Sequence, residues 1–449
     1  MTRDYDVVVI GAGNAGQGAA GVAREAGRSV AVIEADLVGG TCPNRGCVPK
    51  KVLVAAAEAL DVIARAGSHH IEVAGASLDW PALIRRKRAI VEPLPGEMAA
   101  SLARRGIDLV RGAARFRGPD NVEVAGETLR GAHIVVATGS VTRRLPIDGA
   151  DLMMTSDEFL EMDALPSSIA FVGAGVIAME FAHVLARAGV KVTLLEVAPR
   201  PLAQLDADAV AALVAYSRTL GIDIHTGVEV EQIAAHGDRL TVQYRDAGAA
   251  VTLEVDRIVN GAGRVANLDG LDLDAAGIAV DRGRVALDDT LRSKDNPRVY
   301  FAGDAVTGAP QLSPVATYEG RIVGHNLVDD EPRTPDYSTW PSAVFTVPAL
   351  AQVGLTEEQA RDQGVNVVAK ESDIRGWISA RSYGEEAAYA KVLVDQDSRR
   401  IVGAHLLGHG AAETIHLFAM AMRCGITADE LARGEYVYPT FSNDVKFLV

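Results

Sequence analysis

The stretch Asp6-Val7-Val8-Val9-Ile10-Gly11-Ala12-Gly13-Asn14-Ala15-Gly16 carries a β-branched run directly into a glycine-rich turn. The apolar run predicts a buried parallel strand. The three glycines permit a tight turn and let a pyrophosphate approach the backbone N–H groups at the start of the following helix. An Ala-rich helix is expected to end near Gly27, and a second strand from Ser29 to Ile33 delivers Glu34. Because such an acid accepts hydrogen bonds from a ribose, this register predicts a dinucleotide-binding unit.

The same design recurs in the middle of the chain. A strand from Ile169 to Val172 precedes Gly173-Ala174-Gly175-Val176-Ile177-Ala178, and a helix to Ala188 and a strand from Lys191 to Glu196 follow. Alanine at the third position of the fingerprint is an accepted variant. Glu34 lies 18 residues after Gly16, and Glu196 lies 18 residues after Ala178. Two matched units predict two dinucleotides.

A pair of cysteines follows the first unit, within Gly39-Gly40-Thr41-Cys42-Pro43-Asn44-Arg45-Gly46-Cys47-Val48-Pro49-Lys50. The only other cysteine is Cys424, which excludes a disulfide framework and a four-cysteine zinc site. We interpret Cys424 as a small core residue at the end of a helix. No spacing of His, Cys or carboxylate residues predicts a metal site. A nucleotide site followed by two cysteines at a helix start is the arrangement that a flavin needs to exchange electrons with a dithiol.

The gross composition limits the class of protein. With 449 residues the chain is expected to hold roughly two to four domains, and 48% apolar residues with 44 glycines suit an α/β fold. The net charge of −15 argues against nucleic acid or anionic lipid as a partner, and we expect the basic run at 85–88 to be a solvated helix face. No apolar stretch approaches the ~18–20 residues needed to span a bilayer, and no signal peptide is evident. Few cysteines indicate the cytoplasm.

Further segments suggest strands and a last domain. Ile134–Gly139 predicts a strand that runs into a turn, and Val299–Asp304 predicts a strand that delivers a carboxylate beside Gly303. Beyond Pro332 the pattern changes to that of a separate α+β domain. Its expected strands and helices are Ser342–Thr346, Lys391–Val394, Ile401–Leu407, Glu413–Arg423 and Ala428–Arg433.

These residues together resemble the FAD-dependent pyridine nucleotide–disulfide oxidoreductases, which include glutathione reductase, dihydrolipoamide dehydrogenase and mercuric reductase. The resemblance runs from about Asp6 to Phe447, and the most specific motif is the cysteine segment at 39–50. The other matching motifs are Ala137-Thr138-Gly139, Gly261-Ala262-Gly263-Arg264, Gly303-Asp304, Phe345-Thr346, Val353-Gly354-Leu355-Thr356-Glu357 and Gly403-Ala404-His405-Leu406-Leu407-Gly408.

The resemblance implies two Rossmann-like dinucleotide-binding domains and a C-terminal α+β dimerisation domain. The implied order is an FAD-binding domain in two parts, an inserted NAD(P)-binding domain and an interface domain, at 1–148 and 264–335, 149–263, and 336–449. The chain is then expected to act as a homodimer.

The resemblance also implies roles for single residues. Gly11, Gly13, Gly16 and Glu34 would hold the ADP half of FAD, and Asp304 its ribityl chain. The other residues expected to bind a cofactor are Gly40, Thr41, Thr138, Gly139, Gly173, Gly175, Ala178, Glu196, Gly263, Arg264 and Gly303. Cys47 would be the charge-transfer thiol against the flavin, and Cys42 the interchange thiol that attacks the substrate. Lys50 would lie near flavin N5, paired with Glu180, where a cation stabilises negative charge on the reduced flavin.

Nucleotide preference is expected to lean to NADH. The carboxylate of Glu196 can accept from a ribose 2′-OH and repels a 2′-phosphate, while Arg200, four residues later, could soften this bias.

The chain departs from the pattern near its C-terminal end. Tyr438 and Asn443 stand where thiol–disulfide members of the family have a His and a Glu, which act from the partner subunit as a proton shuttle. A phenol with a reference pKa of ~10 shuttles protons poorly near neutral pH compared with an imidazole at ~6.5. Mercuric reductases also carry a Tyr here, but they add a C-terminal pair of vicinal cysteines, which this chain lacks. Pro43 and Val176 replace a commoner Val and a gating Tyr.

Three functions are consistent with these residues. The first is a homodimeric FAD enzyme that uses NADH or NADPH to reduce a small-molecule or protein disulfide. The second is a metal-ion or quinone reductase on the same scaffold, in which Tyr438 positions the substrate. The third is a non-catalytic redox sensor whose cysteine pair reports oxidation to a partner.

Overall fold

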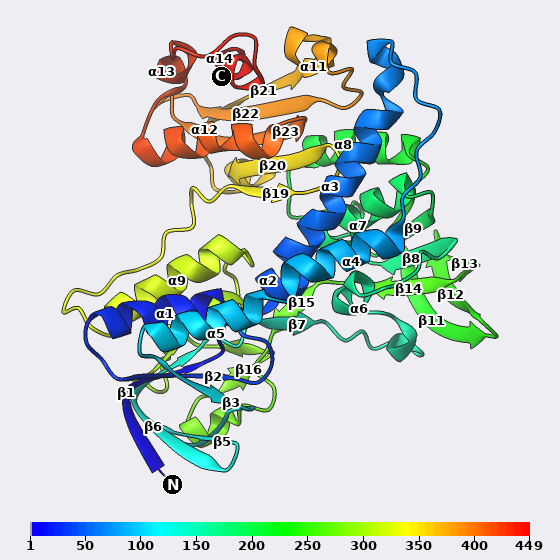
Figure 1. Cartoon of the computed structure of the whole chain (residues 1–449). Helices are drawn as coiled ribbons and strands as arrows, with labels where there is room; N and C mark the ends of the chain where they lie inside the picture. Colours follow the sequence, from blue (N-terminus) through cyan, green and yellow to red (C-terminus); the bar gives the residue numbers. More distant parts are fainter. Residues whose placement is uncertain (1) are drawn as a thin grey trace. The chain divides into compact units, whose positions relative to one another are not determined.

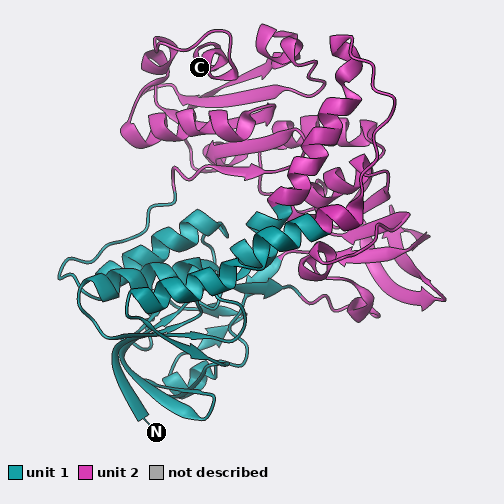
Figure 2. Ribbon diagram, viewed as in Figure 1, with its two compact units in different colours: residues 1–50, 85–143, 264–337 teal, residues 51–84, 144–263, 338–449 magenta. Residues whose placement is uncertain are grey.

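The computed structural model describes residues 2–449 and divides into two compact units (Figure 2). Unit 1 comprises the chain up to Lys50, Arg85–Arg143 and Arg264–Tyr337; unit 2 comprises Lys51–Ile84, Arg144–Gly263 and Ser338–Val449. Two helices, α3 (Cys47–Ala64) and α4 (Trp80–Val91), carry the chain from one unit to the other.

Unit 1 is built on a seven-stranded sheet with the strand order β3-β2-β1-β6-β5-β4, in which β18 also pairs with β6. The pairs β3-β2, β2-β1, β1-β6 and β6-β18 are parallel, and β4 and β5 form an antiparallel extension. These strands are β1 (Thr2–Ile10), β2 (Val30–Glu34), β3 (Asp108–Arg111), β4 (Arg115–Gly118), β5 (Asn121–Val124), β6 (Glu127–Val136) and β18 (Val299–Phe301).

The first strand begins earlier than its apolar run. Thr2 to Tyr5 extend β1 because they pair with the start of β6, in register Thr2↔Thr128 to Tyr5↔Gly131. Only the second half of β1 is fully buried, since Val7 to Ile10 are at most 4% exposed. The hydrophobic pattern did not predict this first half of β1, because its residues are mostly polar and are held in the strand by pairing with β6.

Helices cover the sheet of unit 1. Helix α1 (Asn14–Glu25) packs closely along α9 (Ser313–Asn326), as Figure 1 shows. A Cβ on Gly320 would lie 2.1 Å from the carbonyl oxygen of Ala15, so only glycine allows this approach. The other elements of unit 1 are α2 (Thr41–Arg45), α5 (Leu94–Arg104), β7 (Ser140–Thr142), β15 (Arg264–Ala266), β16 (Val280–Asp281), β17 (Arg284–Val285) and the short 3₁₀ turns Leu273–Ala276 and Gly303–Ala305.

Unit 2 contains the second dinucleotide-binding fold. Its parallel sheet has the order β10-β9-β8-β14, and a three-stranded antiparallel sheet has the order β11-β12-β13. The strands are β8 (Ser168–Val172), β9 (Lys191–Glu196), β10 (Asp223–Thr226), β11 (Glu229–His236), β12 (Arg239–Asp246), β13 (Ala249–Val255) and β14 (Arg257–Asn260). The helices and turns are α6 (Ser156–Leu160), α7 (Val176–Arg187), α8 (Ala207–Thr219), Ala66–His69 and Ala150–Leu152.

The C-terminal part of unit 2 is an α+β fold on a five-stranded sheet of order β19-β20-β23-β22-β21. Helix α12 (Ala411–Cys424) packs on β20 and β23. The strands are β19 (Ser342–Val344), β20 (Ala349–Gly354), β21 (Val367–Asp373), β22 (Tyr389–Asp395) and β23 (Ile401–Gly408). The remaining helices and turns are α10 (Glu357–Asp362), Ile374–Gly376, α11 (Ile378–Ser382), α13 (Ala428–Ala432) and α14 (Phe441–Leu448). The mixed α/β class and the two fingerprint folds are thereby confirmed.

Two predictions about single residues were wrong. Cys424 is exposed, because α12 buries the face with Ile415 and Phe418 and ends at Cys424 before the left-handed Gly425. Lys87 is 1% exposed, so the basic run at 85–88 is only partly a solvated face. Its position three residues after buried Ile84 places Lys87 on the inner face of α4. Among residues 2–449, no helix is long and apolar enough to cross a membrane.

Candidate redox site

The two cysteines lie at consecutive helix starts in unit 1. Cys42 belongs to α2, and Cys47 is the first residue of α3; both are free thiols. The turn before Cys42 needs glycine, because Gly40 has φ +67° and a Cβ on it would lie 3.0 Å from the Cα of Gly13. The side chain of Asn44 fastens this turn by donating to the carbonyls of Val38 (3.1 Å) and Gly40 (2.8 Å). The turn that precedes Cys42 therefore lies directly against the first glycine-rich turn.

One thiol of the pair is acidic. A hydrogen bond from Cys47 lowers the pKa of Cys42 to about 6, against the opposing effect of burial, and Ser313, the Cys47 backbone N–H and the charge of Lys50 lower it further. The hydrogen bond with Cys42 and burial raise the pKa of Cys47. The two values describe one coupled pair, from which the first proton leaves easily and the second with difficulty. The first N–H groups of a helix favour an anion, and the N–H of Cys47 at the start of α3 is one of the groups that lower the pKa of Cys42.

The first glycine-rich turn forms a cradle without side chains. Gly11 has φ +108°, and a Cβ on Gly16 would lie 1.9 Å from the carbonyl oxygen of Gly11. Glu34 closes the turn, because its carboxylate accepts hydrogen bonds from the backbone N–H groups of Ala12 and Asp36, both at 2.8 Å. Backbone N–H groups at the start of α1 and a carboxylate at the end of β2 suit a pyrophosphate and a ribose.

A second polar group lies beside this cradle in unit 1. The hydroxyl of Ser140 donates to Asp304 (2.8 Å) and accepts from Arg264 (2.9 Å). The buried hydroxyl of Thr138 has no hydrogen-bond partner among the described residues. Gly139 and Gly303 both have positive φ, at +71° and +70°. An unpaired buried hydroxyl and turns without side chains fit a bound polar group, as the polar part of FAD would be.

The second fingerprint, in unit 2, repeats the geometry of the first. Gly173 has φ +104°, and Glu196 accepts from the N–H groups of Ala174 (2.6 Å) and Ala198 (2.8 Å). The third small residue, Ala178, is fully buried beside Gly175 at the start of α7, whereas Val176 is 44% exposed.

The guanidinium of Arg200 contacts backbone carbonyls and a carboxylate of the protein. Its Nη1 donates to the carbonyls of Leu202 (3.4 Å) and Leu205 (2.8 Å), and its Nη2 lies 3.8 Å from Glu358. These contacts reduce the capacity of Arg200 to bind a 2′-phosphate.

Glu180 and Tyr438 both lie in unit 2. Glu180 is 3% exposed, and its carboxylate accepts from the N–H of Phe345 at 2.9 Å. Tyr438 is 68% exposed and precedes Pro439 through a cis peptide bond. Asn443 is buried and donates its backbone N–H to the Thr440 hydroxyl at the start of α14 (3.1 Å). Asn443 thus has a place in the capping turn of α14.

Three residues near the site were not found from the sequence. Ser313 lowers the pKa of Cys42, and the side chain of Asn14 donates to the hydroxyl of Ser313. Glu319 is fully buried, accepts from Gly303 N–H (2.6 Å) and the Tyr337 hydroxyl (2.6 Å), and burial raises its pKa to about 7. Ser313 and Glu319 lie on α9 outside every motif, and Asn14 occupies a position of the first fingerprint that the glycine pattern leaves open.

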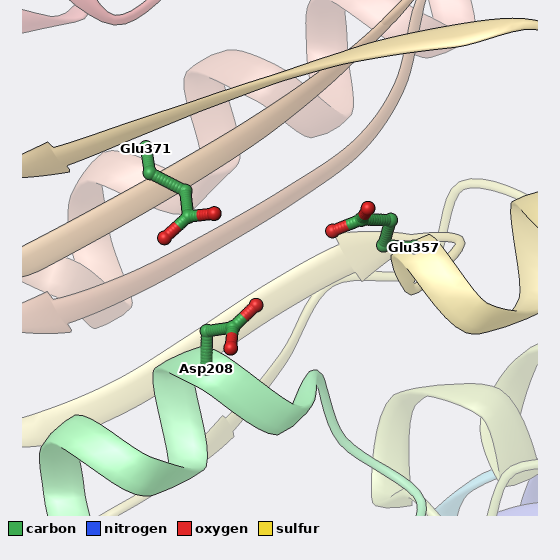
Figure 3. A group of neighbouring side chains, drawn as sticks. All are labelled: Asp208, Glu357 and Glu371. Atoms are coloured by element: carbon green, nitrogen blue, oxygen red, sulfur yellow. The ribbon is translucent and has the colours of Figure 1, made fainter.

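A group of carboxylates lies elsewhere in unit 2. Asp208 of α8, Glu357 of α10 and Glu371 of β21 point toward one another, with one oxygen of each within 4.8 Å of the others (Figure 3). The ammonium of Lys391, which is 1% exposed, pairs with Asp208 and Glu357 and lies 3.4 Å from buried Asp206. Burial opposes its charge, but these partners raise the pKa of Lys391 above its ordinary value. We assign this cluster a structural role, because the lysine already supplies the cation.

Comparison with known proteins identifies the family. Residues 5–320 match the pyridine nucleotide-disulphide oxidoreductase family, and residues 340–448 match the dimerisation domain of that family. The dihydrolipoyl dehydrogenase of Bacillus subtilis is 31% identical, covering 99% of this chain and 97% of the relative. Glutathione reductase of Burkholderia cepacia and mercuric reductase of Streptomyces lividans are each 34% identical, cover 98% of this chain, and are themselves covered to 97% and 95%.

A solved structure agrees with this assignment. The HOCl-induced flavoprotein disulfide reductase RclA from Escherichia coli, also solved as a Cu(II) complex, superposes with a TM-score of 0.89 at 30% identity, covering 99% of both chains. The chain described here therefore belongs to the FAD- and NAD(P)H-dependent pyridine nucleotide-disulphide oxidoreductases, as a flavoprotein disulfide oxidoreductase with a redox-active pair at Cys42 and Cys47.

Proposed function

We propose that this protein uses NADH to reduce a disulfide whose thiols are good leaving groups. The observation that carries the proposal is the pair at the helix starts, in which Cys42 is acidic and hydrogen-bonded to Cys47, next to a cradle that fits FAD. Bound FAD would accept a hydride from the nicotinamide and pass two electrons to a disulfide.

The cysteines would carry out the exchange. Two electrons break the Cys42–Cys47 bond and leave a thiolate on one sulfur and a thiol on the other. The Cys42 thiolate attacks one sulfur of the acceptor, forms a mixed disulfide and expels the first thiolate. Cys47 then loses its proton, attacks the Cys42 sulfur, restores the protein disulfide and releases the second thiolate. The two released thiolates take up that proton and one proton from solvent. The balance is NADH, a proton and a disulfide giving NAD⁺ and two thiols.

The charged residues would assist this transfer. Lys50 follows Cys47 by three residues on α3, where its ammonium can stabilise negative charge near the thiols and the flavin. In unit 2, the buried carboxylate of Glu180 is held by the N–H of Phe345.

NADH is proposed over NADPH on the geometry of Glu196. The carboxylate ends β9 in the same position that Glu34 occupies at the end of β2. The carboxylate of Glu196 would repel a 2′-phosphate. The guanidinium of Arg200 donates to a backbone carbonyl, which reduces its capacity to bind that phosphate.

The proposed assembly is a cytoplasmic homodimer with the domain order deduced from the sequence: FAD-binding at 1–148 and 264–335, NAD(P)-binding at 149–263, and interface at 336–449. The match of residues 340–448 to a dimerisation domain supports it. We propose that the exposed Tyr438 faces the thiols of the partner subunit. Because a phenol is a weak proton donor at neutral pH, thiolates that leave without protonation would be the favoured products.

A metal ion is the second candidate acceptor. The similarity to a reductase solved as a Cu(II) complex supports it, and reduction of a metal ion requires no general acid. Tyr438 would then position the substrate and not transfer a proton.

Steady-state oxidation of NADH against a panel of acceptors tests the proposal. An aromatic disulfide with acidic thiols is expected to turn over at least tenfold faster than glutathione disulfide or lipoamide, because each leaving thiolate needs no proton. Cys42→Ser is expected to abolish turnover of every disulfide. Multiple turnover of Cu(II) alone would favour the second candidate, and NADH reduction without turnover of any acceptor would contradict both.

A further inference from the structure

Helix α9 carries a fully buried carboxylate, that of Glu319, which is 0% exposed. Each of its two oxygens is occupied by one donor of unit 1. Oε2 accepts from the backbone N–H of Gly303 at 2.6 Å, and Oε1 accepts from the hydroxyl of Tyr337 at 2.6 Å. Neither donor is a cation, and burial of a carboxylate without a basic partner is unfavourable. An apolar side chain would be easier to bury here, so the carboxylate is best explained by the two groups that it holds.

The first of these groups belongs to the turn that delivers Asp304. The N–H of Ala302 still donates to the carbonyl of Val136 in β6 (3.0 Å), and the chain leaves the sheet at the next residue. This residue, Gly303, has φ +70°, which favours glycine. The carboxylate of Glu319 accepts from the first N–H beyond the sheet and therefore anchors the start of the turn.

The second group, the hydroxyl of Tyr337, determines which oxygen of Glu319 is left for the turn. Tyr337 follows α9 at the end of unit 1, and the preceding residue, Asp336, donates its N–H to the hydroxyl of Tyr318 on the same helix (3.0 Å). Burial and the neighbouring carboxylate raise the pKa of Tyr337, so its hydroxyl stays protonated and donates. Because this hydroxyl occupies Oε1, Oε2 is left for Gly303.

We propose that Glu319, oriented by Tyr337, is a positioning residue for FAD, which fixes the turn at Gly303 so that the carboxylate of Asp304 is in place before the cofactor binds. The hydroxyl of Ser140 also holds Asp304, at 2.8 Å. A turn that is already ordered loses less conformational freedom on binding, which strengthens the retention of FAD. The inference rests on the FAD site of the proposed function, in particular on the expected contact of Asp304 with the cofactor.

The test measures how fast FAD leaves the holoenzyme. A phosphodiesterase that cleaves free FAD is added so that released cofactor cannot rebind, and the rise in flavin fluorescence gives the release rate. Glu319→Leu removes both hydrogen bonds and is expected to release FAD at least about tenfold faster than the wild type, because a hydrogen bond to a charged group is lost. Glu319→Gln can accept from Gly303 through its amide oxygen and donate to the oxygen of Tyr337 through its amide nitrogen. It is expected to stay within about threefold of the wild type.

Two further variants separate positioning from a general loss of structure. Tyr337→Phe keeps the ring and loses the hydroxyl, and it is expected to accelerate release by about three- to tenfold. Val323→Ala is the matched control, because Val323 lies one helical turn after Glu319 on α9 and is fully buried. The change lowers the free energy of unfolding but leaves both hydrogen bonds of Glu319 intact. Its release rate is expected to stay within about twofold of the wild type.

Asp304→Ala tests the contact on which the inference rests, and it is expected to accelerate release at least as much as Glu319→Leu. An unchanged rate in Asp304→Ala would refute this contact and the inference with it. Fast release in Asp304→Ala with an unchanged rate in Glu319→Leu would overturn the role of Glu319 alone, and Tyr337→Phe decides in the same way if Glu319→Leu does not fold. Release in Val323→Ala or Glu319→Gln as fast as in Glu319→Leu would also overturn it. Because release requires neither NADH nor an electron acceptor, the outcome is independent of the proposed reaction.

Discussion

Replacing Glu196 with Gln is expected to remove most of the preference for NADH. The change keeps the size of the side chain and removes the negative charge at the end of β9. Both carboxylate oxygens face backbone N–H groups of the turn, at 2.6 Å from Ala174 and 2.8 Å from Ala198. The carboxylate is thus fixed where the adenosine ribose of a nucleotide would lie.

The size of the effect follows from Coulomb's law. A 2′-phosphate of charge near −2 placed about 5 Å from a carboxylate in a water-like dielectric is disfavoured by about 2 kcal/mol, which is roughly thirtyfold in affinity. The ratio of second-order rate constants for NADH and NADPH is therefore expected to fall by roughly ten- to thirtyfold in Glu196→Gln. Added salt is expected to reduce the wild-type ratio, because the strand end is open to solvent.

The assay is the anaerobic rate of flavin reduction in a stopped-flow instrument, which needs no electron acceptor. Glu34→Gln is the matched control, because Glu34 has the same two backbone contacts in the first fingerprint. It is expected to weaken FAD retention and to leave the NADH to NADPH ratio unchanged. A wild-type enzyme that is reduced faster by NADPH, or a Glu196→Gln variant with an unaltered ratio, would refute the reasoning.

Three other predictions concern catalysis, packing and pH. The double variant Tyr438→His with Asn443→Glu is expected to raise turnover of glutathione disulfide at pH 7 by roughly ten- to hundredfold, within the range of general acid–base catalysis, and fast wild-type turnover would contradict this account. Lys391→Met leaves the buried carboxylate of Asp206 without its cation and is expected to lower the free energy of unfolding by about 3–5 kcal/mol in urea titrations, whereas exposed Lys191→Met is expected to change it by less than about 0.5 kcal/mol. Burial raises the pKa of Glu319 to about 7 from 4.5, so between these pH values the folded protein keeps a proton that the unfolded chain has released. The free energy of unfolding is therefore expected to fall by up to about 3 kcal/mol as the pH rises from 4.5 to 7. An equally steep fall in Glu319→Gln would exclude this residue as the cause.

The dinucleotide folds could be predicted because their signals are local. Gly11 and Gly16 are demanded by backbone that leaves no room for a Cβ, and Glu34 and Glu196 end strands of regular length. The cysteine pair was equally visible, since both thiols belong to one segment at two helix starts. Each of these features lies within fewer than about forty consecutive residues, so it can be recognised without knowing the tertiary contacts.

The rest depends on contacts between distant segments. Asn14 and Ser313 are 299 residues apart, so their hydrogen bond leaves no pattern in the sequence. The burial of Lys87 was not predicted, because four consecutive basic residues show no helical periodicity that would indicate which of them faces the core. Cys424 was taken for a core residue on its average behaviour, whereas its place at the end of α12 decides its exposure.

The central claim is that electrons reach the Cys42–Cys47 pair through FAD, and an anaerobic titration with NADH tests it most directly. Two-electron reduction of the oxidised holoenzyme is expected to release two titratable thiols per chain. Because Cys42 and Cys47 share one remaining proton, the molecules that carry the negative charge on Cys47 are expected to produce a long-wavelength charge-transfer band. That band is expected to vanish in Cys47→Ser and to persist in Cys42→Ser, as the assigned roles require. Reduction of the flavin with no new thiols at these two positions would contradict the account.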